Sequence, residues 1–448
     1  MKKLTIIGGG ITGMAAAYIA SRDGWDVTLL EGSSQLGGLI RTFRIGGKWL
    51  ECFYHHHFID DLEFKWFLKE LKIDDKLRFY RTSMGIFCDG KIYDFNGPLD
   101  LMRFEPLNIF NKFRFIFTGI YLGKIADWRT WEGITATDWF YKYVGRKVTE
   151  KIWKPLLEVK FGSYSERVPL SWMIGRLKQR MNSRRGAEEQ LGYLDGSLQL
   201  LTDTFLEVSM AKGVKVILNT EVNKLIIKDS TLYGVETTNG VIKDGLFLVT
   251  IPVNCLVPLL KEGASDYAKA LSSIQYMGAV CTILELVRPL TNVYWLNIAD
   301  SDFPFGGIIE HTNFIPPGKY DGSHIVYLSK YFTQNDYLST ASVNEVKSIM
   351  IEPLKRINPE FSQDWIKNVY VFKSNTAATA CWTNFSKFVP HCKTPIKNLY
   401  IVNMSHIYPD ERSCNNAIKI AARACRIIGI DTSMIPVGPS LSGQIGMD

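Results

Sequence analysis

The sequence lacks several features that would by themselves indicate a class of protein. None of its eight cysteines forms a Cys-x-x-Cys pair or a zinc-type cluster with histidine, so no metal site is expected. No uncharged apolar run reaches the ~18 residues of a membrane-spanning helix, and the apolar stretch before the first glycines is too short for a secretory signal. No internal repeat is present. These absences favour a reducing, cytoplasmic location.

A strong charge bias is also missing. The chain of 448 residues has 52 Lys and Arg against 45 Asp and Glu, and the excess of +7 is scattered. Such a mild excess does not predict a nucleic-acid partner. Hydrophobic residues make up 46% of the chain, which is ordinary for a globular protein and excludes extensive disorder. The length favours two or three domains, or one large domain with insertions, and leaves the oligomeric state open.

The segment from residue 4 to Glu31 carries the strongest pattern. Residues 4–7 indicate a buried strand, residues 14–20 favour a helix, and residues 26–31 indicate a second strand that ends in Glu31. A β-α-β unit with glycines at its first turn is typical of dinucleotide-binding folds. We expect Glu31 to accept hydrogen bonds from a ribose diol, a role that disfavours a 2′-phosphate.

The turn between that strand and helix follows the pattern Gly-x-Gly-x-x-Gly. Gly8 allows a tight turn, Gly10 lets the backbone approach a pyrophosphate, and Gly13 lets the helix and strand pack closely. The N–H groups at the positive end of the helix then face the phosphates. The residues expected to contact the dinucleotide here are Gly8, Gly10, Ile11, Thr12 and Gly13.

A second glycine-rich segment follows Glu31. Its adjacent glycines, Gly37 and Gly38, permit close backbone approach, and Arg41 adds a charged hydrogen-bond donor. In these residues the chain resembles the flavin amine oxidase, protoporphyrinogen oxidase and phytoene desaturase superfamily. The resemblance implies FAD as the cofactor, with contacts from Glu31, Gly32, Gly37, Gly38, Leu39 and Arg41. Taken alone, the segment is also compatible with an ordinary glycine turn.

The resemblance extends over most of the chain and implies an α/β fold. That fold has a Rossmann-like FAD-binding domain (GR2-type) with an inserted α+β substrate domain. The FAD-binding domain is expected to comprise residues 1–97, 191–254 and 391–431. The substrate domain is expected to comprise residues 98–190 and 255–390, and residues 432–448 are expected to form a loose tail.

The resemblance also implies FAD contacts far along the chain. A residue placed like Val222 brackets the adenine with its backbone. The polar turn and helix that follow the last strand are expected to close the site through Asp410, Arg412 and Asn415. At the start of that helix this chain has Cys414-Asn415-Asn416, where the superfamily usually has a glycine.

Tyr54 and the run His55–His57 stand where the superfamily passes the flavin ring. We expect Tyr54, His56 and His57 to act there as acid–base or electrostatic partners, and packing at a domain interface is the alternative. Successive side chains cannot all face one point, so these histidines are not expected to bind a metal. The lysine that amine oxidases place near the flavin is replaced in this chain by Cys281 or Thr282.

Two further segments have two interpretations each. Residues 107–124 are aromatic and cationic, which is compatible with a peripheral membrane contact on the cytoplasmic face. A core helix whose Lys and Arg reach outward is the favoured interpretation. Lys178, Arg180, Arg184 and Arg185 either meet an anionic substrate or form a solvated loop, and the loop is favoured.

The resemblance implies an FAD-dependent oxidoreductase with a small-molecule substrate. In this hypothesis a small organic or lipophilic substrate transfers a hydride to flavin N5, and the protein binds and orients both partners. One alternative is a sugar isomerase similar to UDP-galactopyranose mutase, which uses reduced flavin without net redox. A second alternative is a non-catalytic FAD-bound scaffold.

Overall fold

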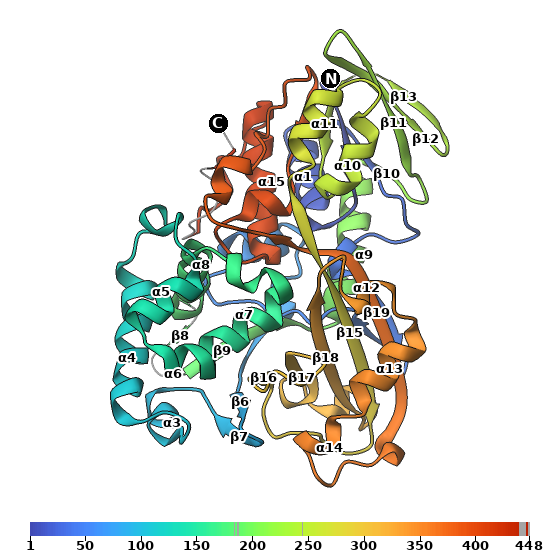
Figure 1. Ribbon diagram of the computed structural model, residues 1–448. Coiled ribbons are helices and arrows are strands. Elements are labelled where there is room, and N and C mark those ends of the chain that lie inside the picture. The colour runs from blue at the N-terminus through green and yellow to red at the C-terminus, as the bar shows by residue number, and fades with distance from the viewer. Residues whose placement is uncertain (183, 186–187, 244, 439–444, 447–448) are drawn as a thin grey trace.

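The computed structural model describes residues 1–182, 184–185, 188–243, 245–438 and 445–446. Its upper part contains a five-stranded parallel sheet with the strand order β10-β2-β1-β14-β20 (Figure 1). Because all five strands are parallel, their carboxyl ends share one edge, and the first glycine turn lies at that edge. The strands are β1 Lys3–Ile7, β2 Asp26–Leu30, β10 Lys215–Ile217, β14 Leu246–Val249 and β20 Leu399–Ile401.

Side chains of this sheet alternate between two cores, as the period of two in a strand requires. Ile6, Leu29 and Leu248 pack against a layer of helices, whereas Ile7 and Val249 pack against a layer of strands and short helices. The helical layer consists of α1 Ile11–Arg22, α2 Leu62–Glu70, α9 Ser197–Ala211 and α15 Cys414–Ile428. The other layer consists of β11 Val222–Lys228, β12 Thr231–Thr237, β13 Gly240–Lys243, α10 Val253–Leu260 and α11 Ser265–Leu271.

A second, seven-stranded sheet forms the lower part of Figure 1, with the order β19-β15-β18-β17-β16-β6-β7. Its long strands β15, β18 and β19 are antiparallel. The strands are β6 Met84–Cys88, β7 Lys91–Asp94, β15 Gln275–Leu286, β16 Trp295–Ile298, β17 Gly307–Glu310, β18 His324–Phe332 and β19 Ile366–Ala380. Three short helices follow β18, namely α12 Tyr337–Thr340, α13 Val343–Ile351 and α14 Leu354–Ile357.

Residues 84–94 belong to this second sheet, although the sequence assigned residues 1–97 to the FAD-binding domain. β6 pairs in parallel with β16, with Gly85 opposite Leu296, and β7 continues from β6 as a hairpin. The interior of the second sheet therefore includes an early part of the chain. A short strand such as β6 does not reveal from sequence which of two sheets it joins.

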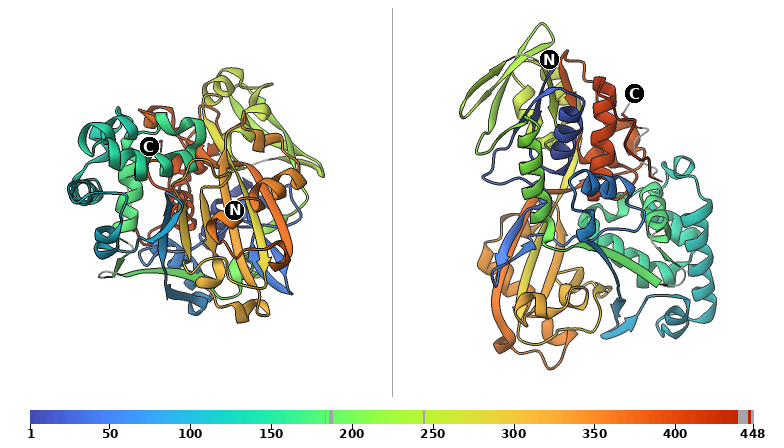
Figure 2. Two further views of the ribbon diagram at one scale, coloured as in Figure 1. Left: turned by 60° about the horizontal axis from the view of Figure 1, so that its bottom comes forward. Right: turned by 180° about the vertical axis from the view of Figure 1, so that it is seen from behind.

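A group of helices lies beside the second sheet, at the left of Figure 1 and the right of the rear view in Figure 2. Its core is aromatic, with Phe140 stacked on Trp153 at 4.8 Å between ring centroids. The helices are α3 Pro98–Arg103, α4 Ile109–Ile120, α5 Ala136–Tyr143, α6 Arg146–Val148, α7 Lys154–Phe161 and α8 Leu170–Asn182. Smaller strands are β3 Thr42–Ile45, β4 Lys48–Glu51, β5 Leu77–Arg81, β8 Arg184–Arg185 and β9 Glu188–Leu194.

The structure of α4 differs from the favoured prediction, which was a core helix whose Lys and Arg side chains reach outward. Phe110, Phe113 and Phe117 are 77%, 48% and 68% exposed, whereas Lys112 is buried. Lys112 Nζ donates to the carbonyl of Met102 at 2.7 Å, so the end of α3 satisfies its charge. The phenylalanines fall on the outer face because their spacing of three and four residues places them on one side of the helix. The core-helix interpretation is therefore wrong for this face.

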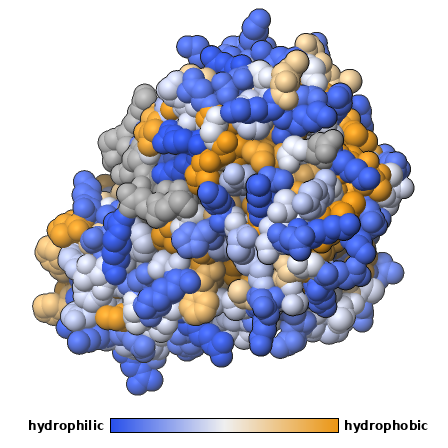
Figure 3. Space-filling model, turned by 90° about the horizontal axis from the view of Figure 1, so that it is seen from above, coloured by the Kyte–Doolittle hydropathy of each residue, from blue (hydrophilic) through white to orange (hydrophobic). Residues whose placement is uncertain are grey.

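Seen from above, polar and charged side chains cover most of the surface, and hydrophobic side chains form separate patches between them (Figure 3). Among the described residues, no helix combines the length and the apolar character needed to cross a bilayer.

The predicted loose tail is packed over the part that the structure describes. Ile435 is buried in the core of the helical layer, and the backbone N–H of Gly438 donates to Glu63 Oε1 at 2.9 Å. The Gly438 carbonyl accepts from Lys419 Nζ at 3.1 Å. The prediction of a loose tail from residue 432 is therefore wrong for residues 432–438. The composition of this segment resembles a linker, but here the backbone of Gly438 contacts both members of a buried ion pair.

Gly13→Ala is expected to lower the free energy of unfolding by about 1–3 kcal/mol, the cost of overpacking a tight contact. An added Cβ would lie 1.9 Å from the carbonyl oxygen of Gly8, which is backbone and cannot move aside cheaply. Thermal and denaturant unfolding measure the effect. The matched control is Gly318→Ala, whose Cβ would meet no described atom within 4 Å. Equal stabilities of the two variants would contradict the assigned contact.

Candidate active site

A large cavity of about 870 Å³ connects the parallel sheet with the substrate side of the chain. At one end it is lined by the β1–α1 turn and by the segments that follow β14 and β20. At the other end it is lined by β6, β16, β18 and the helices α4, α7 and α8. Two molecules bound at the two ends would therefore share one continuous space.

The first glycine turn has the geometry that the sequence predicts. Gly8 has a φ of +112°, and a Cβ there would lie 2.8 Å from Thr250 Oγ1. Gly10 precedes α1 with an ordinary φ of −70°, and its added Cβ would meet nothing closer than the Gly37 carbonyl at 4.0 Å. The open space beside Gly10 is the cavity itself, which Gly10 lines. A side chain at this position would therefore occupy ligand space rather than clash with protein.

Glu31 organises both glycine segments. Its Oε2 accepts from the backbone N–H of Gly9 at 2.7 Å, and its Oε1 accepts from the backbone N–H of Ser33 at 2.9 Å. The Gly37 N–H donates to the Gly9 carbonyl at 2.9 Å, which joins the second segment to the first. Glu31 also lines the cavity, so its remaining acceptor capacity faces the space where a ribose would lie.

The donor set of this end fits an adenine dinucleotide diphosphate. No side chain caps the N-terminus of α1, and Gly10, Ile11 and Thr12 line the cavity there. Uncapped N–H groups at the positive end of a helix bind phosphate. Arg41 contributes a cation to the same wall. FAD would be held by these groups, with its diphosphate at α1 and its ribose at Glu31.

The structure brings together ten of the residues predicted to contact FAD. The members that line the cavity are Gly8, Gly10, Ile11, Thr12, Glu31, Gly37, Gly38, Leu39, Arg41 and Arg412. Five others lie outside its lining, namely Gly13, Gly32, Val222, Asp410 and Asn415. Gly32 nevertheless lies near the start of β11, because its added Cβ would be 3.9 Å from Glu221. Asn415 instead accepts from the backbone N–H of Phe64 at 2.9 Å and joins α15 to α2.

Sequence reasoning missed the contributions of two strand ends. Thr250, Ile251 and Pro252 follow β14 and line the cavity, and Asn403 and Met404 follow β20 and do the same. The rule that ligands bind outside the carboxyl ends of parallel strands was sufficient to find these residues.

Two of the three adjacent histidines face the cavity, and the third faces away. His55 and His56 line it, whereas His57 stacks on Phe64 with ring centroids 3.8 Å apart. Burial, with the nearby Arg412, lowers the pKa of His55 to about 4. Burial, with Arg180 and Arg176, also lowers the pKa of His56. Both imidazoles are therefore neutral at pH 7, and His57 takes a packing position rather than a place in the lining.

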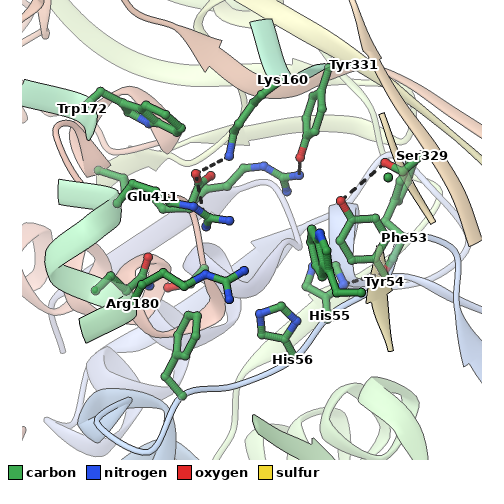
Figure 4. Close-up of a pocket in the computed structure, with 18 of the residues that line it drawn as sticks. Phe53, Tyr54, His55, His56, Lys160, Trp172, Arg180, Ser329, Tyr331 and Glu411 are labelled. Atoms are coloured by element: carbon green, nitrogen blue, oxygen red, sulfur yellow. Dashed lines mark hydrogen bonds and ion pairs between the residues drawn. The ribbon is translucent and has the colours of Figure 1, made fainter. Parts of the chain in front are cut away.

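Tyr54 belongs to the same wall as the two histidines. Its ring lies edge-on to Trp295 with centroids 5.1 Å apart, and its hydroxyl accepts from Ser329 Oγ at 3.4 Å. Burial raises the pKa of Tyr54, so the phenol remains protonated. Figure 4 shows Tyr54 and His56 directed toward the same open space as Arg180. This wall is aromatic, uncharged and able to form hydrogen bonds.

Cys281 or Thr282 is expected at the position where amine oxidases have a lysine near the flavin. Neither residue lines the cavity. Two lysines reach it from other elements, Lys160 on α7 and Lys373 on β19. Lys373 Nζ donates to backbone carbonyls, including that of Ser339 at 2.8 Å. It therefore joins β19 to the α12 segment.

A cationic cluster, of which the sequence predicted only Arg412 as a site residue, faces the two histidines. Lys160 Nζ contacts Glu411 Oε2, and Arg176 Nη1 lies 3.6 Å from the same oxygen. Arg412 Nη2 donates to the Tyr331 hydroxyl at 2.5 Å. Burial alone would raise the pKa of Glu411, but Lys160 and Arg176 outweigh it and lower the pKa to about 2. Figure 4 shows Glu411 and Lys160 opposite Tyr54.

The residues of the basic run predicted near residue 180 have different outcomes. Arg180 lines the cavity and donates to Glu189 Oε1 at 2.9 Å. The side chains of Arg184 and Arg185 lie outside the described residues. The solvated-loop interpretation is therefore wrong for Arg180.

A group with metal-ligand geometry lies where the hairpin β6–β7 meets the segment after β16. Cys88, Asp89 and Asp300 bring ligand atoms within 4.8 Å of one another. Both carboxylates already have partners, because Lys151 Nζ donates to Asp89 at 2.6 Å and Asp300 accepts from the backbone N–H groups of Asp89 and Gly90. These partners satisfy the two carboxylates without a metal ion.

Comparison with known proteins identifies the site. A family described as flavin-containing amine oxidoreductase matches residues 11–428. The chain belongs to this family. The match confirms the predicted superfamily, the α/β fold class, FAD as the cofactor and an oxidoreductase class of enzyme.

Individual relatives are distant. The flavin-dependent L-tryptophan oxidase of Lentzea aerocolonigenes is 27% identical over 128 residues, which are 26% of this chain and 25% of the relative. A candidate protoporphyrinogen oxidase from Exiguobacterium has a TM-score of 0.76 at 16% identity, over 95% of this chain and 98% of that one. A reduced UDP-galactopyranose mutase has a TM-score of 0.71 at 14% identity, over 97% and 95%. The curated relatives are thus matched over a quarter of their length or less, and the structures share the fold.

Gly10→Val is expected to give a folded protein without bound FAD. The backbone at Gly10 suits any residue and the added atoms enter open cavity, so the variant obstructs the ligand rather than the fold. Flavin absorbance per mole of protein and the melting temperature measure the two properties. Gly318→Val, far from the glycine turn in sequence, serves as the control. Full flavin content in Gly10→Val would refute the assigned diphosphate position.

Proposed function

We propose that the protein oxidises an organic substrate that lies at the substrate end of the cavity, against FAD bound across the β1–α1 turn. The observation that carries the proposal is the continuity of the cavity between these two ends. FAD, when bound, supplies the hydride acceptor, and the chain supplies binding, orientation and electrostatics. A substrate and FAD that fill this space would displace water from the reacting groups.

We propose that Tyr54 and His56 act on the substrate and that His57 positions them. A protonated Tyr54 donates a hydrogen bond, and a neutral His56 accepts a proton or a hydrogen bond. His56 Nδ1 lies 3.3 Å from the Tyr294 hydroxyl, which fixes the orientation of its ring. His57 holds the segment through its stack on Phe64.

The function is tested by an anaerobic substrate screen that follows flavin absorbance. We expect at least one small organic or lipophilic substrate to bleach the flavin, with the product recovered in oxidised form. The His56→Phe variant is expected to bleach more slowly at equal flavin content. Exchange of sugar ring size only after reduction by dithionite would instead support the mutase-like alternative. A flavin that no donor reduces would support the scaffold.

We also propose that the exposed face of α3 and α4 contacts the cytoplasmic surface of a membrane. The large apolar side chains of this face are Leu99, Met102, Ile109, Phe110, Phe113, Phe117 and Ile120. Arg103 and Arg114 are exposed on the same two helices. Apolar side chains beside cations match the boundary between acyl chains and anionic headgroups.

The double variant Phe113→Ser, Phe117→Ser is expected to bind vesicles of anionic phospholipid at least about tenfold more weakly, since each buried phenylalanine contributes ~1.5–3 kcal/mol. Vesicle flotation measures the bound fraction. The control is Met210→Ser on α9, which removes a side chain that is 59% exposed elsewhere. Equal losses in the two proteins, or none in either, would count against this face.

A further inference from the structure

The cationic cluster has more positive charge than its protein partners neutralise. Lys160, Arg176 and Arg412 surround a single carboxylate, Glu411. The side chains of Lys160, Arg176 and Glu411 are only 15%, 26% and 9% exposed. Buried charges are costly unless they are paired. A surplus of cations in this position therefore favours an anionic occupant.

Arg412 provides a second, independent sign of an absent partner. Its Nη2 donates to the neutral Tyr331 hydroxyl, and its Nε is buried with no hydrogen-bond partner among the described residues. A guanidinium has five N–H donors in a fixed planar fork that matches a carboxylate or phosphate. Arg412 also lines the cavity, so its guanidinium group borders the space in which an anion would lie.

The side of the cavity that α3 and α4 form is apolar. The cavity lining from α3 and α4 contains no charged residue, and it includes Leu101, Phe115 and Ile116. Opposite lie further apolar side chains of α7 and α8, among them Leu156 and Leu177. This wall accepts a hydrocarbon chain and gives no hydrogen bonds to a sugar or a nucleotide.

This apolar side of the cavity meets the exposed apolar face of α3 and α4. Pro98 and Ile120 both line the cavity and are exposed, and Ile120 is one of the apolar side chains of that face. The apolar wall of the cavity therefore continues onto this exposed apolar face. The cationic cluster lines the same cavity.

We propose that the substrate is an amphiphile with a hydrocarbon chain and an anionic head group, a carboxylate or a phosphate, bound by Lys160, Arg176 and Arg412. The chain lies along α4 and α8, and the head lies beside His55, His56 and the FAD. This inference rests on the proposed oxidoreductase function and names its substrate class. The same surplus of cations disfavours a polycationic amine, and the apolar wall disfavours a nucleotide sugar.

Equilibrium binding to the FAD-loaded protein tests the substrate class without turnover. The probes are dodecanoate, dodecyl phosphate, methyl phosphate and dodecyltrimethylammonium, each below its micelle concentration, with calorimetry and the flavin spectrum as readouts. We expect dodecanoate or dodecyl phosphate to bind at least tenfold more tightly than methyl phosphate, and dodecyltrimethylammonium to bind more weakly still. The tighter of the two anions identifies the head group. Equal affinities for the anionic and cationic chains would overturn the proposal.

Two variants assign the two parts of the site. Arg176→Met is expected to weaken the anionic amphiphile about 10- to 100-fold, the scale of a lost charged hydrogen bond, and to keep its flavin. Gly119→Trp, which adds a side chain where a Cβ meets no described atom within 4 Å, is expected to weaken dodecanoate but not methyl phosphate. Arg146→Met, at an exposed cation on α6, is the control.

The measurements also distinguish failure of the head-group assignment from failure of the oxidoreductase proposal. Unchanged amphiphile affinity in Arg176→Met would overturn the head-group assignment. Loss of flavin in Arg176→Met would show that the cluster serves the cofactor, which also overturns it. If the amphiphiles bind as expected but none of the screened substrates bleaches the flavin, the oxidoreductase proposal fails and the binding site stands.

Discussion

The close approach of α1 to the end of β1 is the constraint on which the rest of the site depends. No side chain fits between Gly13 and the Gly8 carbonyl, so the helix begins directly at the edge of the parallel sheet. That position directs the uncapped N-terminus of α1 into the cavity. Glu31 then ties the turn to the second glycine segment through Gly9. The anion-binding end of the cavity follows from these backbone contacts.

The other end of the cavity is governed by charge in a poorly solvated space. Cations on α7, α8 and the turn before α15 converge there, and burial together with these cations lowers the pKa values of His55 and His56. This electrostatic setting comes from three segments that are far apart in sequence. In the proposed substrate assignment, this charge disfavours a cationic amine, although the chain belongs to a family of flavin-containing amine oxidoreductases.

More of the residues at the cofactor end of the cavity than at the substrate end could be predicted from the sequence. The glycine turn and Glu31 are local, and each residue's role follows from the β-α-β unit that contains it. The cluster of Lys160, Arg176 and Glu411 depends on how α7 and α8 pack against the turn before α15, which no local pattern encodes. The same limit explains Asn415, whose place at the start of α15 suggested a ligand contact, whereas its side chain joins α15 to α2.

Residues 432–438 form part of the packed structure of the helical layer. Gly438 bonds to both members of the buried ion pair between Lys419 of α15 and Glu63 of α2. The first turn of α15 also lines the cavity through Cys414 and Ala417. A break in the chain before Gly438 would leave a carboxylate and an ammonium group under-solvated inside the protein. The integrity of this terminal segment and the retention of the prosthetic group are thereby linked through a single helix.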